Sequence, residues 1–161
     1  MVFVTTTVKK WTPVFANKRY GRLVVDMLRE VLSRHQVSLA AYVLMPSHFH
    51  ALMGFKEITQ LPRMMQTFKS LSTRRLRPIL SDELRKVFEE DGAFRLWKPR
   101  FDDLVIWSDK QFKIKINYIH NNPVKAGLVG RSTEYIMSSS GDWILGEQGL
   151  ISIDKNWSWL N

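Results

Sequence analysis

Apolar residues recur along this chain at two different spacings, which separates candidate strands from candidate helices. β-branched, aromatic and aliphatic runs predict strands over residues 2–8, 38–45 and 48–55. Apolar side chains at every third or fourth position instead predict amphipathic helices over residues 18–35 and 58–77. The Pro46-Ser47 pair between the second and third runs favours a tight turn, so these two strands should form a hairpin.

The second half of the chain has shorter periodic segments. A short helix is expected over residues 82–90, and Leu104–Trp107 is the candidate fourth strand. Ser108 is a suitable N-cap for a last helix from Asp109 to about Asn121, which Pro123 should stop.

The order of these elements, β-α-β-β-α-β followed by one further helix, is that of a ferredoxin-like split βαβ arrangement. We therefore predict an α+β fold, an antiparallel sheet with helices on one face and the other face partly open, plus a C-terminal helix. No repeat, low-complexity tract or linker interrupts residues 1–161, which favours a single domain. The tail, with Leu150–Ile153 followed by Trp157 and Trp159, is expected to add a strand and pack on the core.

Composition and charge narrow the function classes. The chain has no cysteine, which excludes disulfides and thiolate metal sites and is typical of a reducing cytoplasm. Its first residues lack a leader pattern and its longest apolar run, Leu39–Met45, is too short for a bilayer, so we expect a cytoplasmic protein without a membrane partner. Lys and Arg outnumber Asp and Glu by 24 to 15, a net charge of +9 that favours a polyanionic partner, most simply nucleic acid.

The basic residues cluster in the second predicted helix. Between Arg63 and Arg77 the chain carries five cations and no acid. A helical wheel separates an apolar face from a polar face that contains Arg63, Arg74 and Arg77. Spaced cations beside Ser and Thr suit a phosphate backbone, although an ordinary solvated face has the same composition.

His48 and His50 flank Phe49 at the start of the third predicted strand. Side chains at positions i and i+2 of a strand lie on the same face, so the two imidazoles should be neighbours while Phe49 faces the other way. Imidazole is the commonest metal ligand in proteins, and this spacing indicates half of a metal site. Two histidines alone identify neither the metal nor the reaction.

The last predicted helix supplies further candidate groups. Tyr118 lies outside the apolar stripe, with Lys115 one turn before it and Asn122 one turn after it on the same polar side. A helical tyrosine is usually a packing residue, but this one shares its face with a cation and an amide. This environment suits a phenol that acts on phosphate, with Asn122 offering an oxygen to a metal. His120 lies nearer the apolar edge and is interpreted as a hydrogen-bonded residue.

Three segments of the chain resemble a known family. Residues 42–52 (YVLMPSHFHAL) are similar to the HUH strand of the single-tyrosine transposases, and residues 118–129 (YIHNNPVKAGLV) resemble their catalytic-tyrosine helix and its exit. Residues 96–101 (LWKPRF) also resemble the family. The group with the greatest similarity is the REP-associated tyrosine transposases, relatives of the transposases of the smallest insertion sequences. The resemblance extends from about residue 2 to residue 143, with all motifs in order.

The resemblance implies a role for each matched residue. His48 and His50 would bind a divalent ion, Mg²⁺ or Mn²⁺, with Asn122 as the third ligand. Tyr118 would be the nucleophile that attacks a phosphodiester of single-stranded DNA, leaving a 5′-phosphotyrosine link and a free 3′-OH. Because the covalent link conserves the bond for rejoining, no nucleotide cofactor is needed.

The same resemblance implies contacts with single-stranded or hairpin DNA, with Trp97 as a candidate for base stacking. The candidate DNA contacts are Arg63, Lys69, Arg74, Arg77, Lys98, Arg100 and Lys115. Some relatives act as dimers that exchange catalytic helices, whereas others complete the site within one chain, so a homodimer is one possible state.

Two other function classes stay open. A non-catalytic protein that binds nucleic-acid hairpins, descended from a transposase, would not need Tyr118 and Asn122 aligned on one helix face. A metal-dependent nuclease that uses water would not need the tyrosine, but too few carboxylates accompany the histidines for the usual two-metal site.

Overall fold

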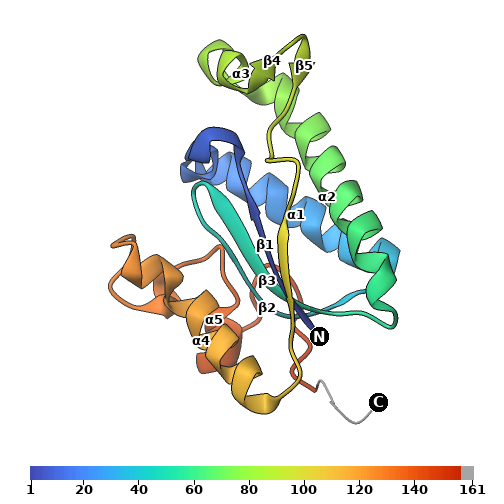
Figure 1. The fold of residues 1–161 in the computed structure, drawn as a ribbon. Coiled ribbons are helices and arrows are strands. Elements are labelled where there is room, and N and C mark those ends of the chain that lie inside the picture. The colour runs from blue at the N-terminus through green and yellow to red at the C-terminus, as the bar shows by residue number, and fades with distance from the viewer. Residues whose placement is uncertain (157–161) are drawn as a thin grey trace.

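An antiparallel sheet of four strands in the order β2–β3–β1–β6 is the centre of this computed structural model, which describes residues 1–156 (Figure 1). Its strands are β1 (Val2–Thr7), β2 (Ser38–Leu44), β3 (His48–Gly54) and β6 (Asp102–Val105). The α-helices are α1 (Lys18–His35), α2 (Leu61–Leu76), α3 (Asp82–Phe88), α4 (Asp109–Lys125) and α5 (Ser140–Ile144). Element order and strand order together confirm the predicted α+β, ferredoxin-like fold.

The two central strands place threonines of β1 opposite the histidines of β3. Antiparallel pairing sets Thr5 against His50 and Thr7 against His48. Directly opposed residues of such a pair lie on the same face of the sheet, so these four side chains share one face. Phe49 points the other way and is buried in the main core.

Helices α1 and α2 cover the face of the sheet to which Phe49 belongs (Figure 1). Their apolar stripes supply core residues such as Val24, Leu28, Met64 and Phe68. Asn17 caps the start of α1 by accepting a hydrogen bond from the amide of Arg19 at 3.0 Å, and Gln36 ends the helix in the left-handed conformation (φ 53°). In the part of the chain that the structure describes, no helix is long and apolar enough to span a membrane.

Helix α4 lies against the opposite face, the one that carries His48 and His50 (Figure 1). Its apolar residues Ile116 and Ile119 form a second, smaller core with buried side chains of β1, β2 and β3. The face that we expected to be partly open is therefore partly covered by the helix that contains Tyr118.

Helix α4 also continues to Lys125, past the proline at which we expected it to stop. Pro123 lacks the amide hydrogen that would bond to the carbonyl of Ile119, but this loss falls in the last turn of the helix. The final turn is closed by the amide of Ala126 on the carbonyl of Asn122 at 3.0 Å and by the amide of Leu128 on the carbonyl of Pro123 at 2.9 Å. Asn122 therefore keeps its helical position one turn after Tyr118.

The fourth strand is two residues earlier than predicted. We expected it over Leu104–Trp107, whereas β6 covers Asp102–Val105. The reason is the register with β1, which sets Val105 opposite Val2 and Asp102 opposite Thr5. Because β6 is an edge strand, its two aspartates can remain exposed.

The expected strand over Leu150–Ile153 is wrong, although this segment does pack on the core. Ile151 is buried, and the amide of Asp154 donates to the carbonyl of Leu39 at 2.8 Å. The edge of β2 that faces away from β3 is also paired at its other end, because the amide of Leu44 donates to the carbonyl of Met137 at 2.8 Å. Trp157 and Trp159 lie outside the described residues.

Helix α3 and a short hairpin, β4 (Glu89–Glu90) with β5 (Ala93–Phe94), extend beyond one end of the sheet (Figure 1). The helix predicted over residues 82–90 is shorter because the backbone becomes extended at Glu89.

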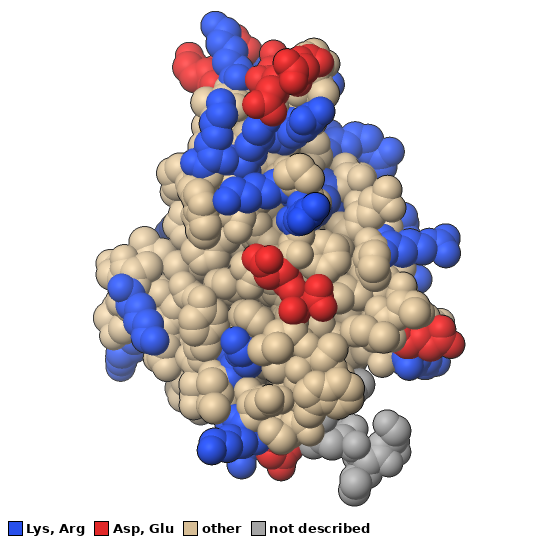
Figure 2. Space-filling view, viewed as in Figure 1, with Lys and Arg blue, Asp and Glu red and all other residues tan. Residues whose placement is uncertain are grey.

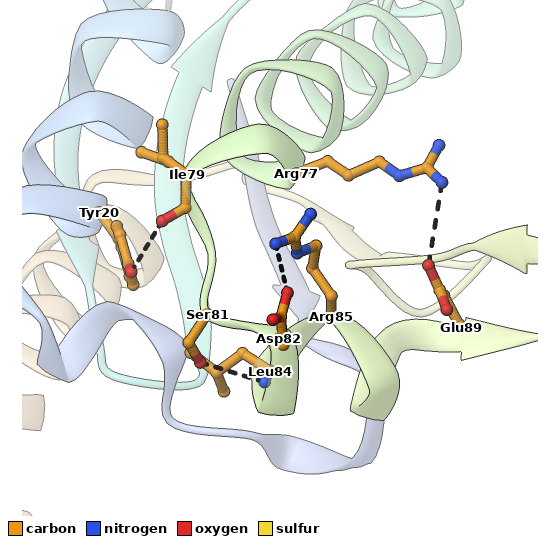
Figure 3. A network of polar contacts seen from close by, with 8 residues as sticks. All are labelled: Tyr20, Arg77, Ile79, Ser81, Asp82, Leu84, Arg85 and Glu89. Atoms are coloured by element: carbon orange, nitrogen blue, oxygen red, sulfur yellow. Dashed lines mark hydrogen bonds and ion pairs between the residues drawn. The ribbon is translucent and has the colours of Figure 1, made fainter.

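Polar contacts attach this extension to the rest of the molecule (Figure 3). Tyr20 of α1 donates to the carbonyl of Ile79 at 3.1 Å, just before α3. Ser81 caps α3, and Arg77 at the end of α2 forms an ion pair with Glu89 of β4 at 3.8 Å. The extension is thus connected to both helices of the main core.

Candidate active site

Two elements bring the candidate catalytic residues together. His48 and His50 come from β3, with ring centroids 4.9 Å apart, and Tyr118 comes from α4. The Tyr118 hydroxyl lies 3.5 Å from Nε2 of His50, and the two rings meet edge to face at 5.2 Å. Asn122, one turn further along α4, lies close enough to His48 to raise the pKa of that imidazole. All four residues that the sequence indicated converge within one chain.

His50 is oriented by the sheet itself. Its Nδ1 lies 2.7 Å from Oγ1 of Thr5, the cross-strand neighbour, and its ring stacks on Phe3 at 5.5 Å. When Nδ1 carries the proton and donates it to Thr5, the lone pair remains on Nε2, the nitrogen nearest Tyr118. Burial, together with the charges of His48 and Lys115, lowers the pKa of His50 to about 3. The ring is therefore neutral at physiological pH, which is the form that binds metal.

His48 is more accessible than His50, and burial also lowers its pKa. Its Nδ1 lies 3.3 Å from the hydroxyl of Ser47 in the preceding turn. Burial lowers the pKa of His48, and the polar side chain of Asn122 partly opposes that effect. Both imidazoles of the pair thus favour the neutral form.

Lys115 supplies a positive charge beside Tyr118. Its Nζ lies 4.3 Å from the centroid of the Phe3 ring and 5.5 Å from that of Tyr118, so two aromatic rings hold the ammonium near the site. Tyr118 itself is 40% exposed, so this residue is accessible from the surface. The site therefore combines an accessible phenol, neutral imidazoles and a cation, a set suited to a phosphate group.

A buried contact fixes α4 on the sheet. His120 lies between Tyr118 and Asn122 in sequence, is 4% exposed, and has its Nε2 2.9 Å from Oγ of Ser139. That hydroxyl also accepts a hydrogen bond from the amide of Tyr42 in β2 at 2.9 Å. Burial lowers the pKa of His120 to about 4. These contacts confirm the interpretation of His120 as a hydrogen-bonded residue, and they hold the tyrosine helix in place.

The donor atoms of the site suit a divalent cation bound by two imidazole nitrogens and one amide oxygen. Within residues 1–156 no carboxylate completes a group of three metal-binding side chains with His48 and His50. An ion held by these neutral groups and Asn122 would keep its full charge for an anionic substrate. The three residues therefore offer donor atoms that fit a divalent metal ion.

A basic pocket of about 960 Å³ lies between α2 and the segment that leads from β5 to β6. Figure 2 shows Lys and Arg side chains gathered over this part of the molecule. The expected DNA contacts Lys69, Arg74, Arg77 and Lys98 line it, together with Arg85 and Arg95, which no sequence pattern indicated. Arg63 and Arg100 are not among its lining residues, and Lys115 belongs to the tyrosine site.

Two residues that we expected to contact DNA make contacts within the protein. The ammonium of Lys69 donates to the carbonyl oxygens of residues 98–100 at 2.9–3.3 Å, and burial lowers its pKa to about 8. Trp97 is 4% exposed, and its indole nitrogen donates to Ser72 at 2.9 Å. The prediction that Trp97 stacks on a base is therefore wrong, because its ring belongs to the core.

Replacing Lys69 with methionine is expected to lower stability by about 1–2 kcal/mol, a fall in Tm of roughly 2–8 °C. The reason is that three carbonyl oxygens of residues 98–100 lose a shared donor. Thermal unfolding followed by circular dichroism measures the change. Lys56→Met, at an exposed lysine, is the matched control and should leave Tm within about 1 °C. An unchanged Tm in Lys69→Met would show that the contacts contribute nothing to stability.

Thr5, Arg85 and Arg95 are the functional candidates that the sequence did not single out. Thr5 is the first of three consecutive threonines in the first strand, and its contact with His50 depends on a pairing register that the sequence of one strand does not contain. Arg95 directly precedes the matched segment at residues 96–101, and Arg85 lies in the short helix expected over residues 82–90. Their position beside α2 results from tertiary packing.

Comparison with solved structures finds the same fold in two transposases. A structure of a REP-associated tyrosine transposase bound to a REP hairpin aligns with a TM-score of 0.69 and 18% identity, over 98% of this chain and 87% of that chain. A putative transposase from Deinococcus radiodurans aligns with a TM-score of 0.53 and 22% identity, over 74% of this chain and 88% of that one. At such identities the similarity establishes the shared fold. No curated protein matches the chain.

Sequence comparison places the chain in a family. Residues 1–122 match the family described as "Transposase IS200 like". The matched span is most of the chain and contains His48, His50, Tyr118 and Asn122. This protein belongs to the IS200-like transposase family.

Proposed function

We propose that this protein cuts and rejoins single-stranded DNA through a covalent bond between Tyr118 and a 5′ phosphate. The observation that carries the proposal is the 3.5 Å contact between the Tyr118 hydroxyl and Nε2 of His50, on the face where Asn122 meets His48. A tyrosine with only a packing role would not need its hydroxyl beside the free nitrogen of a candidate metal ligand. A DNA-breaking reaction also agrees with membership of a transposase family.

The proposed reaction exchanges one phosphodiester bond for another. The Tyr118 oxygen attacks phosphorus and its proton passes to water, while the bond between phosphorus and the 3′ oxygen breaks. The departing oxygen takes up a proton, which leaves a 3′-OH on one strand end and a 5′-phosphotyrosine on the other. Attack by a 3′-OH on the phosphotyrosine reverses the step, so rejoining needs no nucleotide cofactor.

Mg²⁺ or Mn²⁺ bound by His48, His50 and Asn122 would polarise the phosphate that is attacked. The residues of the chain hold this arrangement in place. Thr5 fixes the orientation of the His50 ring, and the contact of His120 with Ser139 fixes the tyrosine helix against the sheet. Lys115 contributes a positive charge where negative charge accumulates on the phosphate.

We propose that the DNA backbone binds in the basic pocket, whose cations include Arg74, Arg77 and Lys98. Because a relative of the same fold is bound to a REP hairpin, we propose single-stranded hairpin DNA as the ligand. Contacts by Arg63 and Arg100 stay predictions. The catalytic residues all come from one chain, so the proposed reaction requires no exchange of α4 between copies, and a homodimer also stays a prediction.

The test is to trap the covalent intermediate. The protein is incubated with Mn²⁺ and a pool of single-stranded hairpin oligonucleotides, and the products are separated on a denaturing gel. A 5′-phosphotyrosine retains the downstream fragment, so a 3′ label should migrate with the protein and a 5′ label with a shortened free strand. EDTA should abolish both signals. Cleavage without an adduct would favour a nuclease that uses water, and binding without cleavage would favour a non-catalytic hairpin binder.

Thr5→Val is expected to weaken Mn²⁺ binding by about 10- to 100-fold. Valine keeps the volume of threonine but removes the hydroxyl that lies 2.7 Å from Nδ1 of His50, so the ring loses its fixed orientation. Isothermal titration calorimetry measures the affinity, and Thr5→Ser, which retains the hydroxyl, should restore it. Equal affinities of the valine and serine variants would contradict the assignment of Thr5 as a positioning residue.

A further inference from the structure

The turn that follows β1 has an unusual backbone. Lys10 and Trp11, within a short 3₁₀ helix over Lys9–Trp11, both adopt positive φ angles, of 56° and 55°. Residues with a Cβ rarely occupy this left-handed region, and two in succession are rarer still. Such strain persists only where surrounding contacts impose it.

Backbone hydrogen bonds on both sides hold this turn rigidly. The amide of Val8 donates to the carbonyl of Ser47, next to His48, and the amide of Lys9 donates to the carbonyl of Leu96, both at 2.8 Å. The amide of Trp11 closes the turn on the carbonyl of Val8 at 3.0 Å. The position of Trp11 is thus fixed relative to the histidine strand before any ligand binds.

The strained backbone holds Trp11 at the surface, and most of the Trp11 side chain stays exposed to solvent. Trp11 is 56% exposed, and its ring meets that of His48 edge to face at 5.6 Å. A single exposed tryptophan needs no explanation by itself. One that is held in a strained turn against a catalytic-site residue suggests a function that requires its exposed surface.

Trp11 also connects the two sites described above. The ammonium of Lys98 lies 4.8 Å from the centroid of the Trp11 ring, and Lys98 lines the basic pocket. The indole is therefore next to a cation of the pocket on one side and to His48 on the other. A strand that passes from the pocket to the site would cross this ring.

We propose that Trp11 is the stacking platform for the base next to the phosphate that Tyr118 attacks, with Lys98 contacting the backbone of the same nucleotide. Exposed aromatic rings beside cations are the usual means of binding unpaired bases, because every base has a π-face. A duplex has no free base face to offer, so the platform selects single-stranded DNA. This inference rests on the proposed function and states where the substrate strand lies on the protein.

The first experiment measures binding without chemistry. In the Tyr118→Phe background, Trp11→Leu should bind a fluorescein-labelled oligothymidylate at least about 5-fold more weakly by fluorescence anisotropy. Trp11→Phe should retain part of the affinity, and binding to a duplex of equal length should not change. Trp107→Leu, at a tryptophan that is 78% exposed in the β6–α4 connection, is the control and should bind as the parent does. Equal affinities of Trp11→Leu and the parent would overturn the proposal.

The second experiment locates the base. Hairpin oligonucleotides that form an adduct with the unaltered protein are resynthesised with 2-aminopurine at successive positions around the cleavage point. Fluorescence should be quenched at a nucleotide adjacent to that point by the parent, and not by Trp11→Leu. Quenching that is the same in both proteins would refute the assignment of Trp11. Failure of the unaltered protein to form any adduct would refute the proposed function instead, so the two failures are distinguishable.

Discussion

Tyr118→Phe is expected to abolish the covalent protein–DNA adduct while leaving DNA binding and folding unchanged. The substitution removes one hydroxyl, the group that lies 3.5 Å from Nε2 of His50. The ring can keep its edge contacts with Phe3 at 5.8 Å and with His50 at 5.2 Å. Loss of a catalytic nucleophile reduces a rate by at least about 1,000-fold, so no adduct should be detectable on a denaturing gel.

The control for this variant is a tyrosine with an engaged hydroxyl elsewhere. Tyr20→Phe removes the hydrogen bond from Tyr20 to the carbonyl of Ile79, on the far side of the sheet from α4, and should form the adduct at the parental rate. Retention of strand cleavage in Tyr118→Phe would assign the reaction to a water nucleophile. An adduct that survives in Tyr118→Phe would assign it to a different residue of the chain. Either result would contradict the proposed role of Tyr118.

The main elements of the fold were predictable because their side-chain periods are local properties of the sequence. The helix expected over residues 18–35 is α1, and the Pro46-Ser47 turn joins β2 and β3 as predicted. The limits of β6 were not predictable in this way, because pairing with Val2 and Thr5 of a strand about one hundred residues earlier determines them. The tail has strand-like residues, but other backbone groups already occupy part of the edge of β2.

In the candidate site, the residues that share a face of one strand or one helix were likewise predictable. His48 and His50 share a face because a strand has a period of two, and Tyr118 and Asn122 share one because a helix has a period of 3.6 residues. What could not be predicted is which neighbours complete the site. Thr5 depends on the strand register, and the engagement of Lys69 with residues 98–100 depends on how α2 packs. A cation on a polar helix face looks the same in sequence whether it binds phosphate or the protein's own carbonyl oxygens.

His50→Gln is expected to abolish adduct formation at low Mn²⁺ concentration and to weaken Mn²⁺ binding by about 100-fold or more. The substitution removes the imidazole nitrogen beside the Tyr118 hydroxyl. Loss of a group that only orients a metal ligand already lowers metal affinity by about 10- to 100-fold. Glutamine is preferred to alanine because His50 is 5% exposed and stacks on Phe3, so a truncation would leave a cavity and destabilise the sheet. Isothermal titration calorimetry and the adduct gel measure the two effects.

Excess metal separates the role of His50 in binding from a role in folding. If His50 is a ligand, millimolar Mn²⁺ should partly restore the adduct in His50→Gln, because His48 and Asn122 still offer two donor groups. His35→Gln is the matched control, since Nε2 of His35 contacts Thr67 at 3.2 Å and lies at the end of α1, remote from the tyrosine helix. It should leave Mn²⁺ affinity and adduct formation unchanged. Parental Mn²⁺ affinity in His50→Gln would show that the histidine pair does not bind the ion, and the contact with Tyr118 would then need another chemical explanation.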